Sequence, residues 1–262
     1  MAKLHVRILH DNLTHARYPV LVSHYRHDVI VAAEKYLDDQ LDGRLSELLR
    51  MELYAGPINT GVVVLNEPPP GDLSIHPGAI AAENADSIIW FDQHGDINTP
   101  ETSAYGFLDG MALATALGLC WRPMANTIPG FQPVDPAKCM LVDARDLDPD
   151  EKALLDQLPI IRAEVGEAAD KVVGLKETGV RRTHLHIDLD VHDPDELQVN
   201  RYARPGGPQP DALREAASCM ARSAPIVGLT LSAYDPAYDA KGEVPPAVGR
   251  LMVDFLAALE RI

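Results

Sequence analysis

Short apolar runs alternate along this chain with longer amphipathic segments. Apolar runs bounded by turn residues are typical of buried strands, and apolar positions three or four apart are typical of helices. We therefore expect strands at Leu4–Leu9, Val20–Val22, Gly61–Leu65, Ser87–Asp92, Cys139–Val142, Thr183–Leu189 and Ile226–Leu231. We expect helices at Val29–Arg50, Ser74–Glu83, Gly110–Leu117, Asp150–Gln157, Val165–Thr178, Pro210–Arg222 and Pro246–Leu259. This alternation predicts an α/β fold in which a mainly parallel sheet lies between layers of helices.

The chain has 262 residues and no clear linker, so one domain is the simpler interpretation. Residues 1–60 are read as a strand followed by a long helix. They form either the first α/β unit of the same sheet or a separate, atypical N-terminal segment. Residues 61–262 then form the main, catalytic domain.

Charge and cysteine usage narrow the class of protein. The formal net charge of −16 argues against a nucleic-acid partner, because a phosphate backbone would be repelled. The sequence contains no run of about eighteen apolar residues, so it predicts no membrane-spanning helix. The first ten residues lack the apolar region of a signal peptide. The three scattered cysteines favour a reducing compartment over a disulfide framework. We therefore expect a cytoplasmic protein without a membrane partner.

Asp92, His94 and Asp96 occupy alternate positions where the apolar run at 87–92 passes into a polar loop. In an extended backbone, alternate side chains project to the same side, so these three can converge on one point. Carboxylates that converge repel one another unless protons or a cation offset their charge. The pattern therefore indicates a candidate metal site.

A second polar cluster lies along the predicted strand at 183–189 and directly after it. From His184 to Asp190 every second residue is polar and those between are apolar, so one face packs and the other is polar. Neighbouring strand ends would bring both clusters together, and carboxylates with an imidazole suit Mn²⁺ or a similar hard divalent ion. We expect one or two Mn²⁺ ions with the ligands Asp92, His94, Asp96, Asp188 and Asp190.

Other interpretations of these residues remain open. Each cluster alone is a weak indication, since most such strings are solvated loops and an Asp after a strand often caps a turn. His184 and His186 fit a buried core as well as a ligand role. The chain shows neither a glycine-rich phosphate loop nor a cysteine–histidine motif, which disfavours phosphate-loop and cysteine-nucleophile chemistry. Few basic residues stand near the predicted ligands, which argues against a phosphoesterase.

Several motifs, in order, resemble those of the ureohydrolase superfamily of arginases and agmatinases. Asp92–Pro100 is similar to the family's Asp-x-His-x-Asp stretch and the Asn-Thr-Pro after it, and Asp188–Pro194 to its Asp-x-Asp-x-x-Asp-Pro. Further similar segments are Arg145–Asp148, Pro205–Gly207 and Asp235–Asp239. The resemblance implies a three-layer αβα fold, two Mn²⁺ ions, and hydrolysis of a guanidino or similar C–N bond.

The chain departs from this family at four positions. Leu73 stands where the family has its first metal-binding histidine, and His76 lies about one helical turn further on. Asp109 stands in place of the proton-shuttling histidine, and Ala233 in place of the acidic residue that holds the guanidinium. Tyr105 replaces a serine near the substrate's amino-acid end. These departures put the second ion and ordinary arginine hydrolysis in question.

Asn98–Thr102 and Leu108–Met111 resemble the corresponding stretches of short arginase-like enzymes that hydrolyse Nω-hydroxy-L-arginine. A less basic leaving group needs less help from a proton donor, which makes loss of the shuttle histidine tolerable. A small guanidino-type molecule is therefore the expected substrate, whereas the sequence predicts no oligomeric state.

The resulting hypothesis is a hydrolase in which a metal-activated water attacks the trigonal carbon of a guanidino-type group. Asp109 and Asp96 are the expected catalytic residues, Asp109 as the proton donor. Asn98 and Asp148 are expected to grip the polar end of the substrate. The alternative is a binding or regulatory module that keeps the fold and has lost catalysis, which the departures at Leu73, Asp109 and Ala233 favour.

Overall fold

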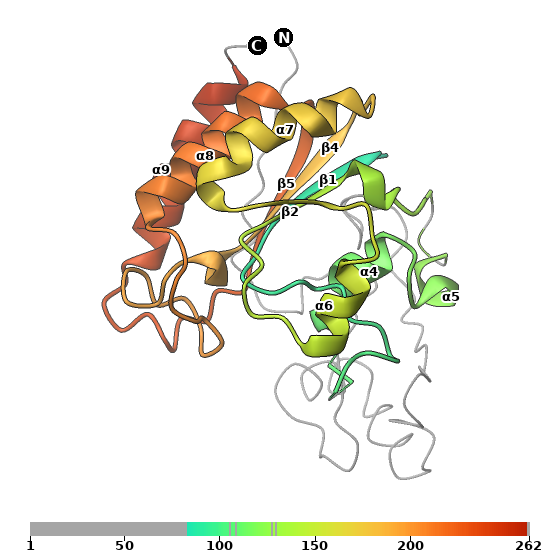
Figure 1. The fold of residues 1–262 in the computed structure, drawn as a ribbon. Helices are drawn as coiled ribbons and strands as arrows, with labels where there is room; N and C mark the ends of the chain where they lie inside the picture. The colour runs from blue at the N-terminus through green and yellow to red at the C-terminus, as the bar shows by residue number, and fades with distance from the viewer. Residues whose placement is uncertain (1–82, 105, 108, 127, 129, 261–262) are drawn as a thin grey trace, which may run out of the picture. The chain divides into compact units, whose positions relative to one another are not determined.

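The computed structural model describes residues 83–104, 106–107, 109–126, 128 and 130–260 (Figure 1). The chain divides into two compact units, residues 1–77 with 106–108 and residues 78–105 with 109–262. The helices and strands of the described residues all belong to the second unit. The elements expected before residue 83, the role of residues 1–60, Leu73, His76 and Tyr105 lie outside the described residues.

Five strands form an all-parallel sheet in this unit: β1 (Ser87–Phe91), β2 (Cys139–Val142), β3 (Ile161–Ala163), β4 (Thr183–Asp188) and β5 (Ile226–Ser232). Their order is β3-β2-β1-β4-β5. The chain therefore runs outward from the centre to one edge and then returns to the other side of β1. The predicted α/β fold with a parallel sheet is confirmed.

This reversal of direction fixes where a site can form. The connection after β1 leads toward β2, whereas the connection after β4 leads toward β5 on the opposite side. The two connections diverge at the carboxyl ends of adjacent strands, and in open α/β sheets such a switch point leaves a crevice that binds ligands. Trp90 pairs with His186 in this central register, so the residues that follow both strands emerge side by side.

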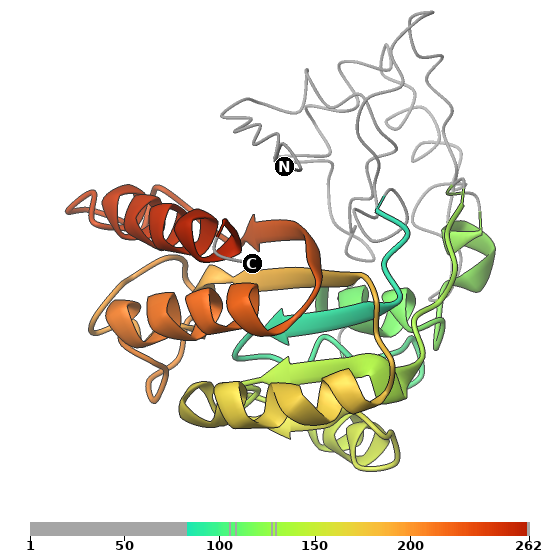
Figure 2. The same cartoon turned by 90° about the horizontal axis from the view of Figure 1, so that it is seen from above.

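The helices are α4 (Ala112–Ala116), α5 (Arg122–Ala125), α6 (Pro149–Leu155), α7 (Ala168–Glu177), α8 (Pro210–Ser223) and α9 (Val244–Leu259). Short 3₁₀ turns are η2 (Asp109–Met111), η3 (Pro136–Lys138), η4 (Val165–Glu167) and η5 (Leu189–Val191). Figure 2 shows α7 and α8 lying across one face of the sheet. Among the described residues, no helix combines the length and apolar character needed to cross a membrane.

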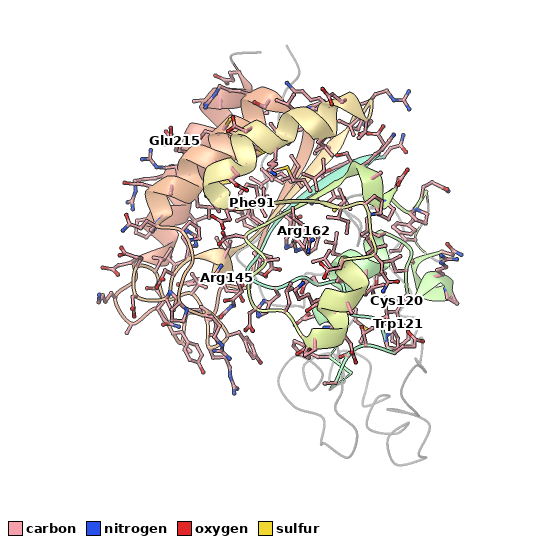
Figure 3. All side chains as sticks on the ribbon, viewed as in Figure 1. Phe91, Cys120, Trp121, Arg145, Arg162 and Glu215 are labelled. Atoms are coloured by element: carbon pink, nitrogen blue, oxygen red, sulfur yellow. The ribbon has the colours of Figure 1, made fainter. Side chains whose placement is uncertain are left out.

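Alternate residues of β1 and β4 form the part of the hydrophobic core that the sheet contributes. Ile89 and Phe91 of β1, with Leu185 and Ile187 of β4, are fully buried. Side chains from α7, α8 and α9 belong to the same core cluster, including Val172, Leu175, Leu213, Met220, Leu251 and Phe255. Burial of each large apolar side chain contributes about 1.5–3 kcal/mol. Figure 3 shows Phe91 within this layer and Glu215 on the outer side of α8.

Two local conformations differ from the sequence prediction. The extended stretch ends at Asp188, and Asp190 lies in the 3₁₀ turn η5, with its backbone N–H donating to Asp188 Oδ1 over 3.0 Å. Asp96 has a φ of 49°, in the left-handed region, so the run from Asp92 is not extended throughout. Simple alternation therefore applies only within the strands, and turns set the final direction of the later side chains.

Candidate metal centre

Asp92, His94 and Asp190 form a group of potential metal ligands among the described residues. One ligand atom from each lies within 4.8 Å of the others. His94 Nδ1 lies 3.2 Å from Asp92 Oδ1 and 3.7 Å from Asp190 Oδ1. Both aspartates are almost fully buried, whereas the His94 side chain is 34% exposed, so solvent reaches the group from the histidine side.

Asp96 and Asp188 lie close enough to this group to add to its negative field. Burial raises the pKa of Asp188 to about 9, and the charges of Asp92 and Asp190 contribute. Burial likewise raises the pKa of Asp92, and it raises that of Asp96 well above its ordinary value, with help from Asp92, Asp188, Glu151 and Asp109. A cation bound among these carboxylates would stabilise their ionised forms, which burial and mutual repulsion disfavour.

The residues present fit a hard divalent ion. Asp190 Oδ1 is buried and has no hydrogen-bond partner among the described residues, although it faces His94. A buried carboxylate oxygen without a partner is costly unless a proton or a cation satisfies it. Carboxylate oxygens with an imidazole nitrogen are the donor set that Mn²⁺ and similar ions accept.

Neutral side chains donate to the second carboxylate oxygen of Asp92 and of Asp188. Trp90 Nε1 donates to Asp92 Oδ2 over 3.1 Å, and Ser232 Oγ donates to Asp188 Oδ2 over 3.1 Å. His186 stacks on Trp90 with ring centroids 3.6 Å apart, and its Nε2 lies 3.2 Å from Ser232 Oγ. Thus His186 supports the donors and is not one of the three grouped ligands, while His184 binds Glu83 and Thr230 further along the sheet.

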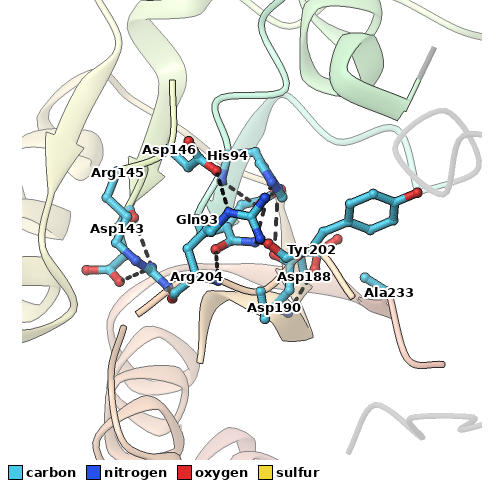
Figure 4. Close-up of polar contacts among 12 residues, drawn as sticks. Gln93, His94, Asp143, Arg145, Asp146, Asp188, Asp190, Tyr202, Arg204 and Ala233 are labelled. Carbon is cyan, nitrogen blue, oxygen red and sulfur yellow. Dashed lines mark hydrogen bonds and ion pairs between the residues drawn. The ribbon is translucent and has the colours of Figure 1, made fainter. Parts of the chain in front are cut away.

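A loop after β4 covers one side of the centre and is anchored by Gln93. This buried side chain donates from Nε2 to the Tyr202 carbonyl over 3.0 Å and accepts from the Arg204 N–H over 2.7 Å. Arg145 adds a bond from Nη2 to the Arg204 carbonyl over 2.9 Å and pairs with Asp143 at 2.8 Å. Figure 4 shows these side chains beside His94 and Asp190.

The predicted substrate-gripping residues contact each other. Asn98 Nδ2 lies 3.4 Å from Asp148 Oδ2, and Asn98 Oδ1 accepts a hydrogen bond from Thr102 Oγ1 over 2.9 Å. Asp148 also lies at the N-cap of α6, where its backbone N–H donates to Glu151 Oε2 over 3.2 Å. The substrate role of the pair stays a prediction.

Asp109 begins the turn η2, and its charge acts on the pKa of Asp96. Desolvation raises the pKa of Asp109 itself. Ala233 directly follows β5 and has a φ of 63°, so its backbone adopts a left-handed conformation uncommon for a residue with a side chain. The methyl group of Ala233 supplies neither charge nor hydrogen bond at this position.

Sequence reasoning missed Gln93, Asn200 and Ser232. Gln93 stands inside the Asp92–Asp96 stretch and could have been considered for that reason. Ser232 ends β5, which pairs with β4, so the alternation of side chains along a strand could have pointed to it. Asn200 lies in a loop without a recognisable pattern, so nothing in the sequence points to it.

The arginase family model matches residues 71–257. The chain belongs to the arginase family. It is 34% identical over 138 residues to the N(omega)-hydroxy-L-arginine amidinohydrolase of Streptomyces lavendulae, covering 52% of this chain and 47% of that protein. It is 33% identical over 137 residues to the arginase of Bacillus caldovelox, covering 47% and 46%.

The chain thus spans about half the length of the curated relatives it matches. Among solved structures, arginase from Bacillus cereus superposes with a TM-score of 0.59 at 25% identity, covering 64% of this chain and 61% of that one. Arginase from Bacillus caldovelox superposes with a TM-score of 0.64 at 22% identity, covering 90% and 82%, which shows the shared fold alone. The predicted resemblance to the ureohydrolase superfamily is confirmed.

Proposed function

We propose that this arginase-family chain is a Mn²⁺-dependent hydrolase that cleaves the C–N bond of a guanidino-type small molecule. The observation that carries the proposal is the convergence of Asp92, His94 and Asp190 at the switch point of the sheet. One buried oxygen of Asp190 has no hydrogen-bond partner among the described residues. When bound, a divalent ion lowers the pKa of water and stabilises negative charge that develops on the substrate.

Asp96 and Asp188 complete the proposed ligand set around one or two ions. Their pKa values are raised because burial and the neighbouring carboxylates oppose ionisation, and a bound cation would offset that opposition. His94 leaves the group open to solvent on one side, which provides access for a small substrate. The protein's acidic balance suits a cationic guanidino group.

Two further roles belong to this proposal. Asp109 holds the proton that the leaving nitrogen receives, and desolvation, which raises its pKa, favours the protonated form. Asn98 and Asp148, joined by their side chains, bind the polar end of the substrate. We propose Nω-hydroxy-L-arginine as the substrate, supported by the similarity to the Streptomyces lavendulae amidinohydrolase.

The test is metal analysis combined with a substrate panel. Purified full-length protein is analysed for metal before and after incubation with Mn²⁺, and hydrolysis of Nω-hydroxy-L-arginine, L-arginine and other guanidino compounds is measured. We expect bound Mn²⁺ and turnover, both lost in Asp92→Ala and both retained in Asp195→Ala, which changes an exposed carboxylate. A metal-replete, active Asp92→Ala variant contradicts the proposal.

The second candidate is a binding module that has lost catalysis. Ala233 favours it, because a methyl group occupies the position at which the resembling family holds the guanidinium. Binding of Mn²⁺ and of guanidino compounds without hydrolysis of any of them supports this alternative over the enzyme.

A further inference from the structure

Asn200, in the loop between η5 and α8, has every hydrogen-bonding group of its side chain engaged. Its Nδ2 donates to Asp190 Oδ2 over 3.2 Å and to the Ala233 carbonyl over 3.0 Å. Its Oδ1 accepts from the backbone N–H groups of Tyr202 and Ala203 over 2.8 and 2.9 Å. A side-chain amide offers two donors and two acceptor sites, and all four are used here in a buried position.

These four bonds hold the Asn200 amide in place and so fix the orientation of the Asp190 carboxylate. Asn200 occupies Oδ2, so the carboxylate is turned with Oδ1 toward His94 Nδ1, 3.7 Å away. Oδ1 is the buried oxygen that lacks a hydrogen-bond partner among the described residues. The amide therefore satisfies one oxygen and leaves the other available to a cation.

Asn200 also links two segments that follow neighbouring strands. Asp190 follows β4, and Ala233 follows β5 with its left-handed φ of 63°. Such a conformation costs a residue with a side chain free energy that its surroundings must offset. The bond to the Ala233 carbonyl, together with that from Asp235 N–H to the Val199 carbonyl over 2.9 Å, holds this segment against the loop.

We propose that Asn200 is the positioning residue of the metal centre, fixing Asp190 for the ion and joining it to the end of β5. The inference rests on the proposed metal function. Asn200 does not reach the ion; it acts through Asp190. Removal of its amide leaves Asp190 free to rotate, and loss of such an outer partner lowers metal affinity by about 10- to 100-fold.

Gln198 provides a matched control in the same loop. Its Nε2 donates to the backbone carbonyl of Asn200, so Gln198→Ala removes a hydrogen bond from the loop without touching Asp190 or Ala233. A general loosening of the loop would affect Gln198→Ala and Asn200→Ala alike. A positioning role would affect only Asn200→Ala.

The experiment uses the metal-free full chain of the wild type, Asn200→Ala and Gln198→Ala. Mn²⁺ is titrated and free ion is measured by electron paramagnetic resonance, and the visible absorption of the Co²⁺-loaded proteins reports coordination geometry. We expect Kd for Mn²⁺ to rise about 10- to 100-fold in Asn200→Ala, with altered Co²⁺ bands, while Gln198→Ala matches the wild type. If Asn200→Ala does not fold, Asn200→Ser, which keeps one donor, is measured with the same expected direction.

Two results would overturn this inference without contradicting the proposed metal function. One is a wild-type Kd with wild-type Co²⁺ bands in Asn200→Ala; the other is an equal loss of Mn²⁺ affinity in both variants with unchanged bands. If the wild type binds no Mn²⁺, the proposed metal function fails together with it. Circular dichroism of each metal-free variant verifies that the compared proteins are folded.

Discussion

Glu151 lies so close to Gly95 that a side chain at Gly95 would collide with it: an added Cβ would stand 2.7 Å from Glu151 Oε1. Glu151 is buried and cannot move freely, because Oε1 accepts from the Ile97 N–H over 3.1 Å and Oε2 from the Asp148 N–H over 3.2 Å. The glycine between His94 and Asp96 thus lets α6 support the loop that carries the proposed ligands.

We expect Gly95→Ala to destabilise the protein by about 1–3 kcal/mol, because overpacking forces Glu151 away from its hydrogen-bond donors. Chemical denaturation measures the change. Gly166→Ala, where an added Cβ meets nothing within 4 Å, is the control and is expected to be nearly neutral. The cost of Gly95→Ala should shrink in a Glu151→Ala background; an undiminished cost there would show that Glu151 is not the cause.

Gln93→Ala should cost about 1–3 kcal/mol, since it leaves the Tyr202 carbonyl and the Arg204 N–H without their buried partner. The free energy of unfolding is compared with that of Gln157→Ala, an exposed glutamine whose Nε2 donates to the Ala153 carbonyl. Equal losses in the two variants would argue against an anchoring role for Gln93. Faster amide hydrogen exchange at 200–204 in Gln93→Ala would locate the effect in the loop.

Asp86→Asn should destabilise the protein at pH 7 and have little effect at low pH. Desolvation alone would raise the pKa of Asp86, but it is lowered because the carboxylate accepts from the N–H groups of Arg181 and Arg182. A lowered folded-state pKa gives stability that is present above the unfolded value of about 3.8 and is lost as the pH falls through the folded value.

The measurement for Asp86→Asn is the free energy of unfolding between pH 7 and pH 3. Glu177→Gln, an exposed change of the same charge on α7, controls for net charge. The stability difference between wild type and Asp86→Asn should narrow at low pH. A difference that stays constant would show that the carboxylate charge is not responsible.

Asp188→Asn should separate stability from metal binding. In the metal-free protein it removes a buried carboxyl group whose ionisation is opposed by burial and by neighbouring carboxylates, so the melting temperature should stay equal or rise. Mn²⁺ should raise the melting temperature of the wild type through preferential binding to the folded state, and this rise should be lost in the variant. Thermal scans with Mn²⁺ and with a chelator test both parts; a full Mn²⁺-dependent rise in Asp188→Asn would remove Asp188 from the ligand set.

The sequence predicted β1, β2, β4 and β5 well, because β1, β2 and β5 are short, mainly apolar runs and β4 alternates apolar with polar residues. β3 was missed since Ile161–Ala163 has only three residues at the edge of the sheet, too few to show a period. The division at residue 60 and the cytoplasmic location stay predictions.

At the candidate metal centre, β1 ends at Phe91, directly before Asp92, but Asp190 reaches the group through a 3₁₀ turn that alternation does not describe. Gln93 and Asn200 could not be predicted as supports. Their partners lie far away in sequence or on the backbone, and a single amide in a loop leaves no periodic signal.

The order of the strands also has a consequence for how the protein matures. β1 and β4 are neighbours in the sheet, yet β2, β3 and α7 lie between them along the chain. A nascent chain that has emerged only through β3 can pair one half of the sheet while holding just Asp92 and His94 of the grouped ligands. Asp190 joins them only after β4 has inserted beside β1, a late pairing of distant segments. If the proposed ion binds, its capture would therefore report that β4 has paired with β1.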